Sequence, residues 1–250
     1  FIVASLFFGI TNINAKEYEG YIYWREQIPN TYVTKIKNGE IKHDEMTLLR
    51  RSTDMKFVYC VEPGTNVTNY DKYQIHESNQ AKILSITEEQ WERATLLAYY
   101  GYGYGNHTDS KWYSVTQYLI WKTVSPEVTV YFTDTQGGKK VEKYTSEIAE
   151  LEQLVKDHYK TPSFSNKNFE VGVNNKLVLN DTNGVLNNYK VTSTNGINLS
   201  KSGNSLAIVG LKLGNYTINL SKEDTKYSAP PIVYTSNVSQ DVMSAGKFPT

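Results

Sequence analysis

The sequence predicts a mixed α/β (α+β) fold, with a first domain of strands and helices followed by a small all-β, sandwich-like domain. Three observations predict it. Runs rich in Tyr, Val and Phe alternate as strands do, two segments carry helix start signals, and short strands with Asn-Gly turns follow residue 163. A chain of 250 residues accommodates two such domains. We expect a partial signal peptide over 1–15, a first domain over 16–162 and a second over 163–250.

The first fifteen residues are typical of the end of a secretory signal. An apolar run extends from Phe1 to Ile10, and "INA" before Lys16 fits cleavage after Ala15. The run is shorter than the roughly 20 apolar residues that span a bilayer. A buried N-terminal strand is the alternative. We expect a secreted protein whose mature domain does not insert into a membrane.

The charge balance argues against a nucleic-acid partner. Lys and Arg together number 26, as do Asp and Glu, so the chain lacks the basic excess that neutralises phosphates. Tyrosine is abundant, with 20 residues, and tyrosine offers both apolar area and a hydroxyl at binding surfaces.

Two early segments read as strands. "EYEGYIYWREQ" and "DMKFVYCVEP" alternate in β fashion, and the second ends at Cys60, the only cysteine, before the turn at Pro63-Gly64. An unpaired cysteine in an exported chain indicates an intermolecular bond or a reactive thiol.

Two helices are predicted next. Thr87 and Gln90 form a capping box for a helix that ends at Gly101, and the flexible loop "GYGYGNHTDS" follows. The second helix begins at Asp109 or Ser110 and ends before Pro126. Spacings of three and four place on one of its sides Tyr113, Gln117, Ile120, Trp121 and Val124. Gln117 is therefore expected to face apolar surface.

The rest of the chain predicts a strand, a helix and the β domain. "EVTVYFT" reads as a strand, and "YTSEIAELEQLVKDHYKTP" as an amphipathic helix. From about Ser163, closely spaced strands with Asn-Gly turns at 183–184 and 195–196 predict a small β-sandwich. The final stretch, "SAPPIVYTSNVSQDVMSAGKFPT", predicts one last strand of this domain and an open end.

A single cysteine with histidines elsewhere also occurs in cysteine enzymes. The histidines stand in no motif that marks a base, and we expect them at the surface: His43, His76, His107 and His158. The chain contains no Cys/His metal spacing, no phosphate loop and no serine nucleophile elbow. We expect neither a metal nor a cofactor.

Two motifs in order, "VYCVEPG" and "SVTQYLIWKTVSP", resemble those of a known family. Over roughly residues 18–160 the chain is similar to the thioester domains, also called TQXA domains, of Gram-positive cell-surface adhesins. Leu119 stands where the TQXA pattern has alanine. "SQDVMSAG" resembles the segment that closes the β domain following such domains.

The resemblance implies that Cys60 attacks the side-chain carboxamide of Gln117, expels ammonia and leaves an internal thioester. A lysine amine of a host or surface protein would open this bond in a single turnover, giving an isopeptide at Gln117 and a thiol at Cys60. The chain would then be a self-modifying adhesin module and no enzyme. We expect display at the cell surface through a cell-wall anchor downstream of this sequence.

Two other functions stay open on the residues alone. A secreted cysteine acyltransferase or protease would turn over through Cys60 and a histidine base. A non-covalent adhesin would carry Cys60 as a small buried apolar residue and Gln117 as an ordinary helix amide.

Overall fold

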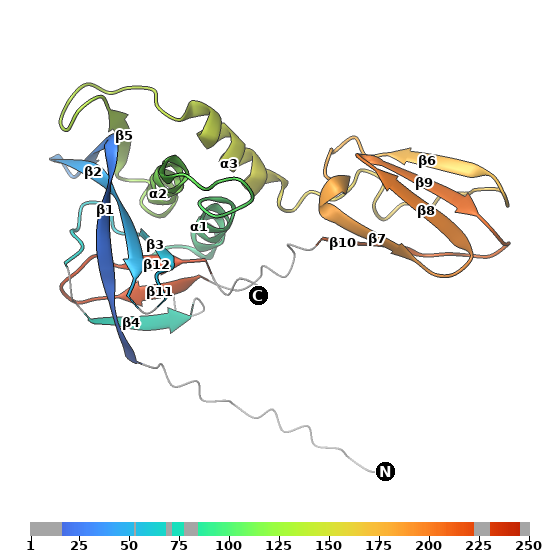
Figure 1. The fold of residues 1–250 in the computed structure, drawn as a ribbon, viewed down its shortest axis with the longest axis horizontal. Coiled ribbons are helices and arrows are strands. Elements are labelled where there is room, and N and C mark those ends of the chain that lie inside the picture. Colours follow the sequence, from blue (N-terminus) through green and yellow to red (C-terminus); the bar gives the residue numbers. More distant parts are fainter. Residues whose placement is uncertain (1–16, 53, 69–71, 78–84, 223–230, 246–250) are drawn as a thin grey trace, which may run out of the picture. The chain divides into compact units, whose positions relative to one another are not determined.

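The computed structural model describes residues 17–52, 54–68, 72–77, 85–222 and 231–245 (Figure 1). It has the mixed α+β fold that the sequence predicts. The chain folds into two compact units. The first contains the described residues as far as Tyr144 together with 231–245, and the second contains 145–222. The predicted signal peptide over 1–15 lies outside the described residues.

The first unit is built on a seven-stranded antiparallel sheet in the order β2-β3-β12-β11-β4-β1-β5. The long strand β1 also pairs with β2, so six of these strands close into a ring. The strands are β1 (Glu17–Lys37), β2 (Glu40–Arg51), β3 (Phe57–Cys60), β4 (Lys72–Glu77), β5 (Thr129–Thr133), β11 (Ile232–Thr235) and β12 (Val242–Ser244). Within the sheet, β3 pairs with β2 on one side and with β12 on the other.

A two-residue turn sets the register of β1 against β2. Asn38 and Gly39 both have positive φ, 52° and 85°, which suits the tight hairpin turn that Asn-Gly favours. Lys37 then lies opposite Glu40, and the pairing continues along both strands. This register brings charged residues of the two strands together.

The two helices of the first unit carry the predicted caps. α1 (Glu88–Tyr100) begins with the Thr87/Gln90 capping box, and α2 (Ser110–Val124) begins at the N-cap Asp109. α2 packs against α1 and against β1, β2, β3 and β5. Figure 1 shows α1 and α2 beside the strands. Among the described residues, no helix has both the length and the apolar composition that crossing a membrane requires.

The C-terminal segment differs from the expectation. The sequence placed 163–250 in one β domain with a single final strand, but β11 and β12 form a hairpin that returns to the first unit. β11 pairs with β4, and β12 pairs with β3 so that Val242 lies opposite Cys60. The "SQDVMSAG" segment thus completes the sheet of the first unit. Alternating residues show that a segment is a strand but do not identify its partner.

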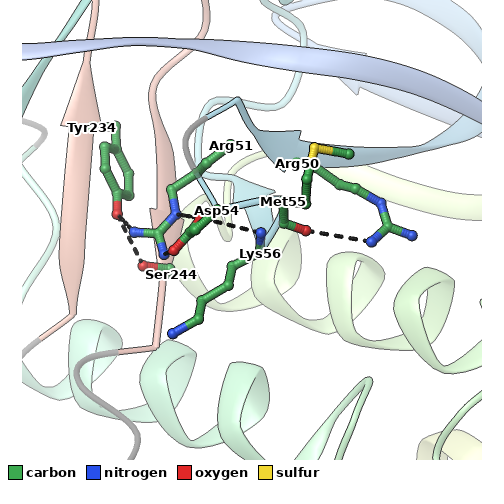
Figure 2. A network of polar contacts seen from close by, with 7 residues as sticks. All are labelled: Arg50, Arg51, Asp54, Met55, Lys56, Tyr234 and Ser244. Atoms are coloured by element: carbon green, nitrogen blue, oxygen red, sulfur yellow. Dashed lines mark hydrogen bonds and ion pairs between the residues drawn. The ribbon is translucent and has the colours of Figure 1, made fainter.

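A polar network fastens this hairpin to the β2–β3 connection (Figure 2). The Arg51 guanidinium binds the hydroxyl of Tyr234 on β11 and the carboxylate of Asp54, with Arg51 Nε 3.0 Å from Asp54 Oδ1. The Tyr234 hydroxyl lies 3.5 Å from the hydroxyl of Ser244 on β12. The network holds both returning strands beside the strand that carries Cys60.

The second unit begins with a helix and continues as two small sheets. α3 (Thr145–Asp157) has the predicted amphipathic pattern, with Leu151 and Val155 buried. One sheet has the order β6-β9-β8 and the other pairs β10 with β7. The elements are β6 (Lys176–Asn180), η2 (Leu186–Asn188), β7 (Tyr189–Ser193), β8 (Ile197–Ser202), β9 (Ser205–Gly210) and β10 (Ile218–Lys222). Apolar residues from both sheets pack around Leu186 and Leu206, as in the predicted sandwich.

Candidate functional site

The structure brings the two predicted site residues together. Cys60 ends β3, and Gln117 lies in the middle of α2, on the face that the spacing predicted to be apolar. The Gln117 side chain is 1% exposed and Cys60 is 7% exposed. A buried amide needs hydrogen-bond partners, and Gln117 finds them on the backbone of Cys60.

The Gln117 carboxamide makes a pair of hydrogen bonds with Cys60. The backbone N–H of Cys60 donates to Gln117 Oε1 at 2.7 Å, and Gln117 Nε2 donates to the backbone O of Cys60 at 2.9 Å. Both polar groups of the amide are thus satisfied by one residue, which fixes the orientation of the carboxamide plane. The carbon of this amide lies against the residue that carries the thiol.

The hydroxyl of Tyr113 holds α2 against the strand that carries Cys60. It donates to Val58 O at 2.7 Å and accepts from the Leu49 N–H at 3.2 Å, so it bridges two residues that lie opposite each other on β2 and β3. Burial, and next the proximity of Cys60, raise the pKa of Tyr113 well above its ordinary value. The phenol therefore remains a hydrogen-bond donor. Its ring stacks on Tyr59 with centroids 4.9 Å apart.

Thr116, the residue before Gln117, fixes α2 against the end of α1. Its hydroxyl donates to Trp112 O at 2.7 Å, and its side chain is also hydrogen-bonded to Tyr59. A Cβ built at Gly101 would lie 2.0 Å from Thr116 Oγ1. Only glycine at this position allows the approach of the two helices that seats Gln117.

A cavity of about 260 Å³ opens beside the pair. Cys60 and Gln117 line it together with Trp121, which follows Gln117 by one helical turn, and with Lys35 and Asp44 from the β1–β2 hairpin. Lys35 Nζ lies 2.7 Å from Asp44 Oδ2 and 4.6 Å from the centre of the Trp121 ring. Neither charged residue was predicted from the sequence. The Asn38-Gly39 turn is the sequence feature from which this ion pair could have been predicted, because it sets the strand register that brings Lys35 beside Asp44.

The returning C-terminal segment also reaches the site. Gln240 lines the cavity, and its backbone N–H donates to Asn66 O at 3.0 Å. The next residue, Asp241, donates its N–H to Glu62 Oε2 at 2.9 Å and accepts from the Ser236 N–H at 2.8 Å. Burial, and less strongly the carboxylate of Glu62, raise the pKa of Asp241 to about 6. The hydrogen bond from the Ser236 N–H acts in the opposite direction.

The expectation of surface histidines is wrong for two of the four. His158 is 3% exposed and His107 is 2% exposed. The ring of His107 stacks on Trp112 with centroids 3.5 Å apart, and its Nδ1 lies 2.7 Å from Tyr100 O. His107 thus packs the "GYGYGNHTDS" loop against α2. No histidine in the described part of the chain lines the cavity that contains Cys60.

The described residues offer no group of three or more His, Cys, Asp or Glu side chains that would hold a metal ion. The arrangement instead places a thiol-bearing residue, a fixed carboxamide and a small cavity at one point. A backbone N–H already donates to the amide oxygen, on which negative charge would develop if the thiol attacked the amide carbon. These are the groups that an acyl transfer between the amide and the thiol requires.

Comparison with known proteins agrees with this geometry. Residues 57–160 match the thioester domain family. The structure is similar to that of the thioester domain of the Staphylococcus aureus TIE protein, with a TM-score of 0.64 and 20% sequence identity over 92% of this chain and 94% of that chain. None of the curated protein sequences matches the chain.

Proposed function

From the thioester domain at residues 57–160, we propose that this protein is a surface adhesin module that attaches covalently to its partner. Cys60 and Gln117 form an internal thioester, and an amine of the partner then takes over the acyl group of Gln117. The pair of hydrogen bonds between the Gln117 carboxamide and the Cys60 backbone carries this proposal. The similar fold of the Staphylococcus aureus TIE thioester domain supports it.

Bond formation needs no external reagent. The sulfur of Cys60 forms a bond to Cδ of Gln117, the Cδ–Nε2 bond breaks, and the thiol proton leaves with the nitrogen as ammonia. A free thiol with a pKa near 8.5 reacts poorly with an amide at neutral pH. Holding the two groups in contact corresponds to an effective molarity on the order of 10⁵ M or more, and the N–H of Cys60 stabilises the oxyanion at Oε1.

Burial protects the bond until an amine arrives. Tyr113 is fully buried beside the pair and Trp121 is 5% exposed, so water has little access from the side of α2. The cavity lined by Lys35, Asp44 and Trp121 is the route by which an amine approaches. Its volume of about 260 Å³ is below the roughly 300–1,000 Å³ of pockets for drug-sized ligands and suits one side chain.

Each molecule reacts once, because transfer converts Gln117 into a substituted amide and returns Cys60 to a thiol. The module is therefore a covalent binding protein and no enzyme. Its partner is a host or surface protein with an accessible lysine. We place the module outside the cell, attached to the cell wall through a segment downstream of residue 250, because a covalent adhesin acts where its partner is.

Intact mass spectrometry tests the proposal. The purified protein should be lighter than its sequence mass by one ammonia, and Cys60→Ala and Gln117→Ala should each restore the full mass. Gln240→Ala is the matched control, since Gln240 lines the same cavity and its side-chain amide donates to Glu62 O. Full mass in the wild type with a titratable thiol refutes the proposal.

Reaction with an amine separates this function from that of a cysteine enzyme. Methylamine should add its mass at Gln117 and expose one thiol, and the adduct should survive thiol reductants. An adduct that forms in Gln117→Ala, or that a reductant releases, would instead favour the acyltransferase or protease that acts through Cys60 alone.

A further inference from the structure

An ion pair with one buried partner, Lys35, lies in the cavity where the amine has to react. Lys35 is 8% exposed, and its Nζ is 2.7 Å from Asp44 Oδ2 and 4.6 Å from the centre of the Trp121 ring. The Asp44 side chain is 41% exposed. Both residues line the cavity with Cys60 and Gln117. One end of the pair is thus fixed inside the sheet, and the other reaches the opening.

An ion pair is unusual in a cavity beside a thioester. Burying an ammonium in a protein interior is unfavourable unless it is paired and hydrogen-bonded, and apolar residues would exclude water from a thioester better. Lys35 also introduces a second amine next to a bond that amines open. The Asp44 carboxylate and the Trp121 ring both lie beside Lys35 Nζ and hold it in place.

We propose that Asp44 is the base that removes a proton from the attacking amine, and that Lys35 positions Asp44 for this step. This inference rests on the proposed function. It names two residues for the step in which the amine opens the thioester. Asp44 contacts the incoming nitrogen and is a catalytic residue in that sense. Lys35 acts only through Asp44.

Atoms and electrons balance in this step. The lone pair of a neutral amine forms a bond to Cδ of Gln117, and its nitrogen becomes acidic as it acquires positive charge. Asp44 accepts one proton from that nitrogen. The Cδ–Sγ bond then breaks, its electron pair stays on the sulfur of Cys60, and the proton passes from Asp44 to this sulfur. The products are an amide at Gln117 and a thiol at Cys60.

Among the described residues, the cavity lining holds one further charged side chain. Glu45 and the thiol of Cys60 line the same cavity. Lys42, which lies opposite Lys35 in the β1–β2 register, directs its ammonium to Gly64 O. Glu45 is the neighbouring carboxylate for which the described residues show no bond to Lys35, and it therefore supplies a matched control.

The order of the reaction in amine tests the role of Asp44. In wild type the opening rate should rise in proportion to methylamine concentration, because the protein supplies the base. In Asp44→Asn a second methylamine has to accept the proton. The rate should then rise with the square of the concentration and fall about 10²-fold at low methylamine, the lower end of typical general-base contributions. Glu45→Gln should behave as wild type. Lys35→Met should be slower, and Lys35→Arg, which keeps a cation beside Asp44, should recover most of the lost rate.

The intact mass of each variant is measured first, so that only protein that has lost ammonia enters the rate measurement. First-order opening of Asp44→Asn at the wild-type rate overturns the proposal. Second-order opening of the wild type overturns it without any variant, which covers the case in which Asp44→Asn fails to form the bond. Loss of ammonia with a titratable thiol before any amine is added would show that Lys35 itself had been acylated, and would also overturn it.

A wild type that never loses ammonia refutes the proposed function, and the role of Asp44 with it. A wild type that loses ammonia and reacts with methylamine, while Asp44→Asn does so equally fast and in first order, refutes the role of Asp44 alone.

Discussion

Tyr113→Phe removes a single hydroxyl that joins three elements. In the structure that oxygen accepts from Leu49 N–H on β2 and donates to Val58 O on β3, at 3.2 and 2.7 Å, from a residue that is fully buried. The phenylalanine ring keeps the stacking on Tyr59. The change therefore isolates the hydrogen bonds from the packing.

The expected loss of stability follows from the two backbone groups left behind. A buried group without a partner costs about 1–3 kcal/mol. Leu49 and Val58 lie opposite each other, so a small movement of the strands restores part of a direct bond between them. We therefore expect a loss of about 2 kcal/mol for the pair, or a fall in melting temperature of roughly 4–8 °C for a unit of this size.

Denaturant unfolding measures this loss, and it is best done in a Cys60→Ala background so that no cross-link contributes. Tyr118→Phe is the matched control on the same helix, because Tyr118 is half-buried and no hydrogen bond from its hydroxyl is seen in the described residues. It should change stability by less than about 0.5 kcal/mol. Equal stability of Tyr113→Phe and Tyr118→Phe would show that the bridging bonds contribute nothing.

Three further changes test other contacts. Gly101→Ala should destabilise the first unit by about 1–3 kcal/mol in denaturant unfolding and reduce the fraction that loses ammonia, because its Cβ would lie 2.0 Å from Thr116 Oγ1. The Asp181 carboxylate accepts hydrogen bonds from four backbone N–H groups. Burial alone would raise the pKa of Asp181, but these bonds outweigh it and lower the pKa. Asp181→Asn should therefore cost about 1.5–3 kcal/mol at pH 7, and this difference should shrink as the pH falls below about 4. Burial and Glu62 raise the pKa of Asp241 to about 6, so the stability that its protonated form gives is complete below about pH 4 and is lost as the pH rises through 6. Asp241→Asn should then match the wild type near pH 4 and exceed it by roughly 1–3 kcal/mol at pH 7 in melting experiments.

Local signals allowed the helices to be predicted, because capping depends on residues three or four positions apart. Thr87 with Gln90 identified the start of α1, and the prediction of Asp109 or Ser110 for the start of α2 includes the observed N-cap, Asp109. The face of α2 that carries Gln117 followed from helical spacing. The contact between Cys60 and Gln117 came from the resemblance of two motifs, since nothing in either segment specifies the other.

Features that depend on strand pairing or on packing between elements were missed. The β12–β3 ladder joins Val242 to Cys60, and alternation in β12 is compatible with any neighbouring strand. His107 was expected at the surface because it stands in a polar, glycine-rich loop, yet stacking on Trp112 buries it. The Lys35–Asp44 pair required the register of a hairpin whose turn, Asn38-Gly39, is visible in the sequence.

The position of β12 has a mechanical consequence. The second unit is inserted in the chain between β5 and β11, so a pull from the C-terminal side first reaches the hairpin β11–β12. The force is then transmitted through the hydrogen bonds between β12 and β3 to Cys60, which is hydrogen-bonded to Gln117. If a partner is attached at Gln117 as proposed, tension between it and the C-terminal side bypasses residues 145–222 while the β12–β3 ladder and the Arg51–Tyr234 contact hold. The inserted residues 145–222 then bear force, and extend, only after the strands of the first unit have separated.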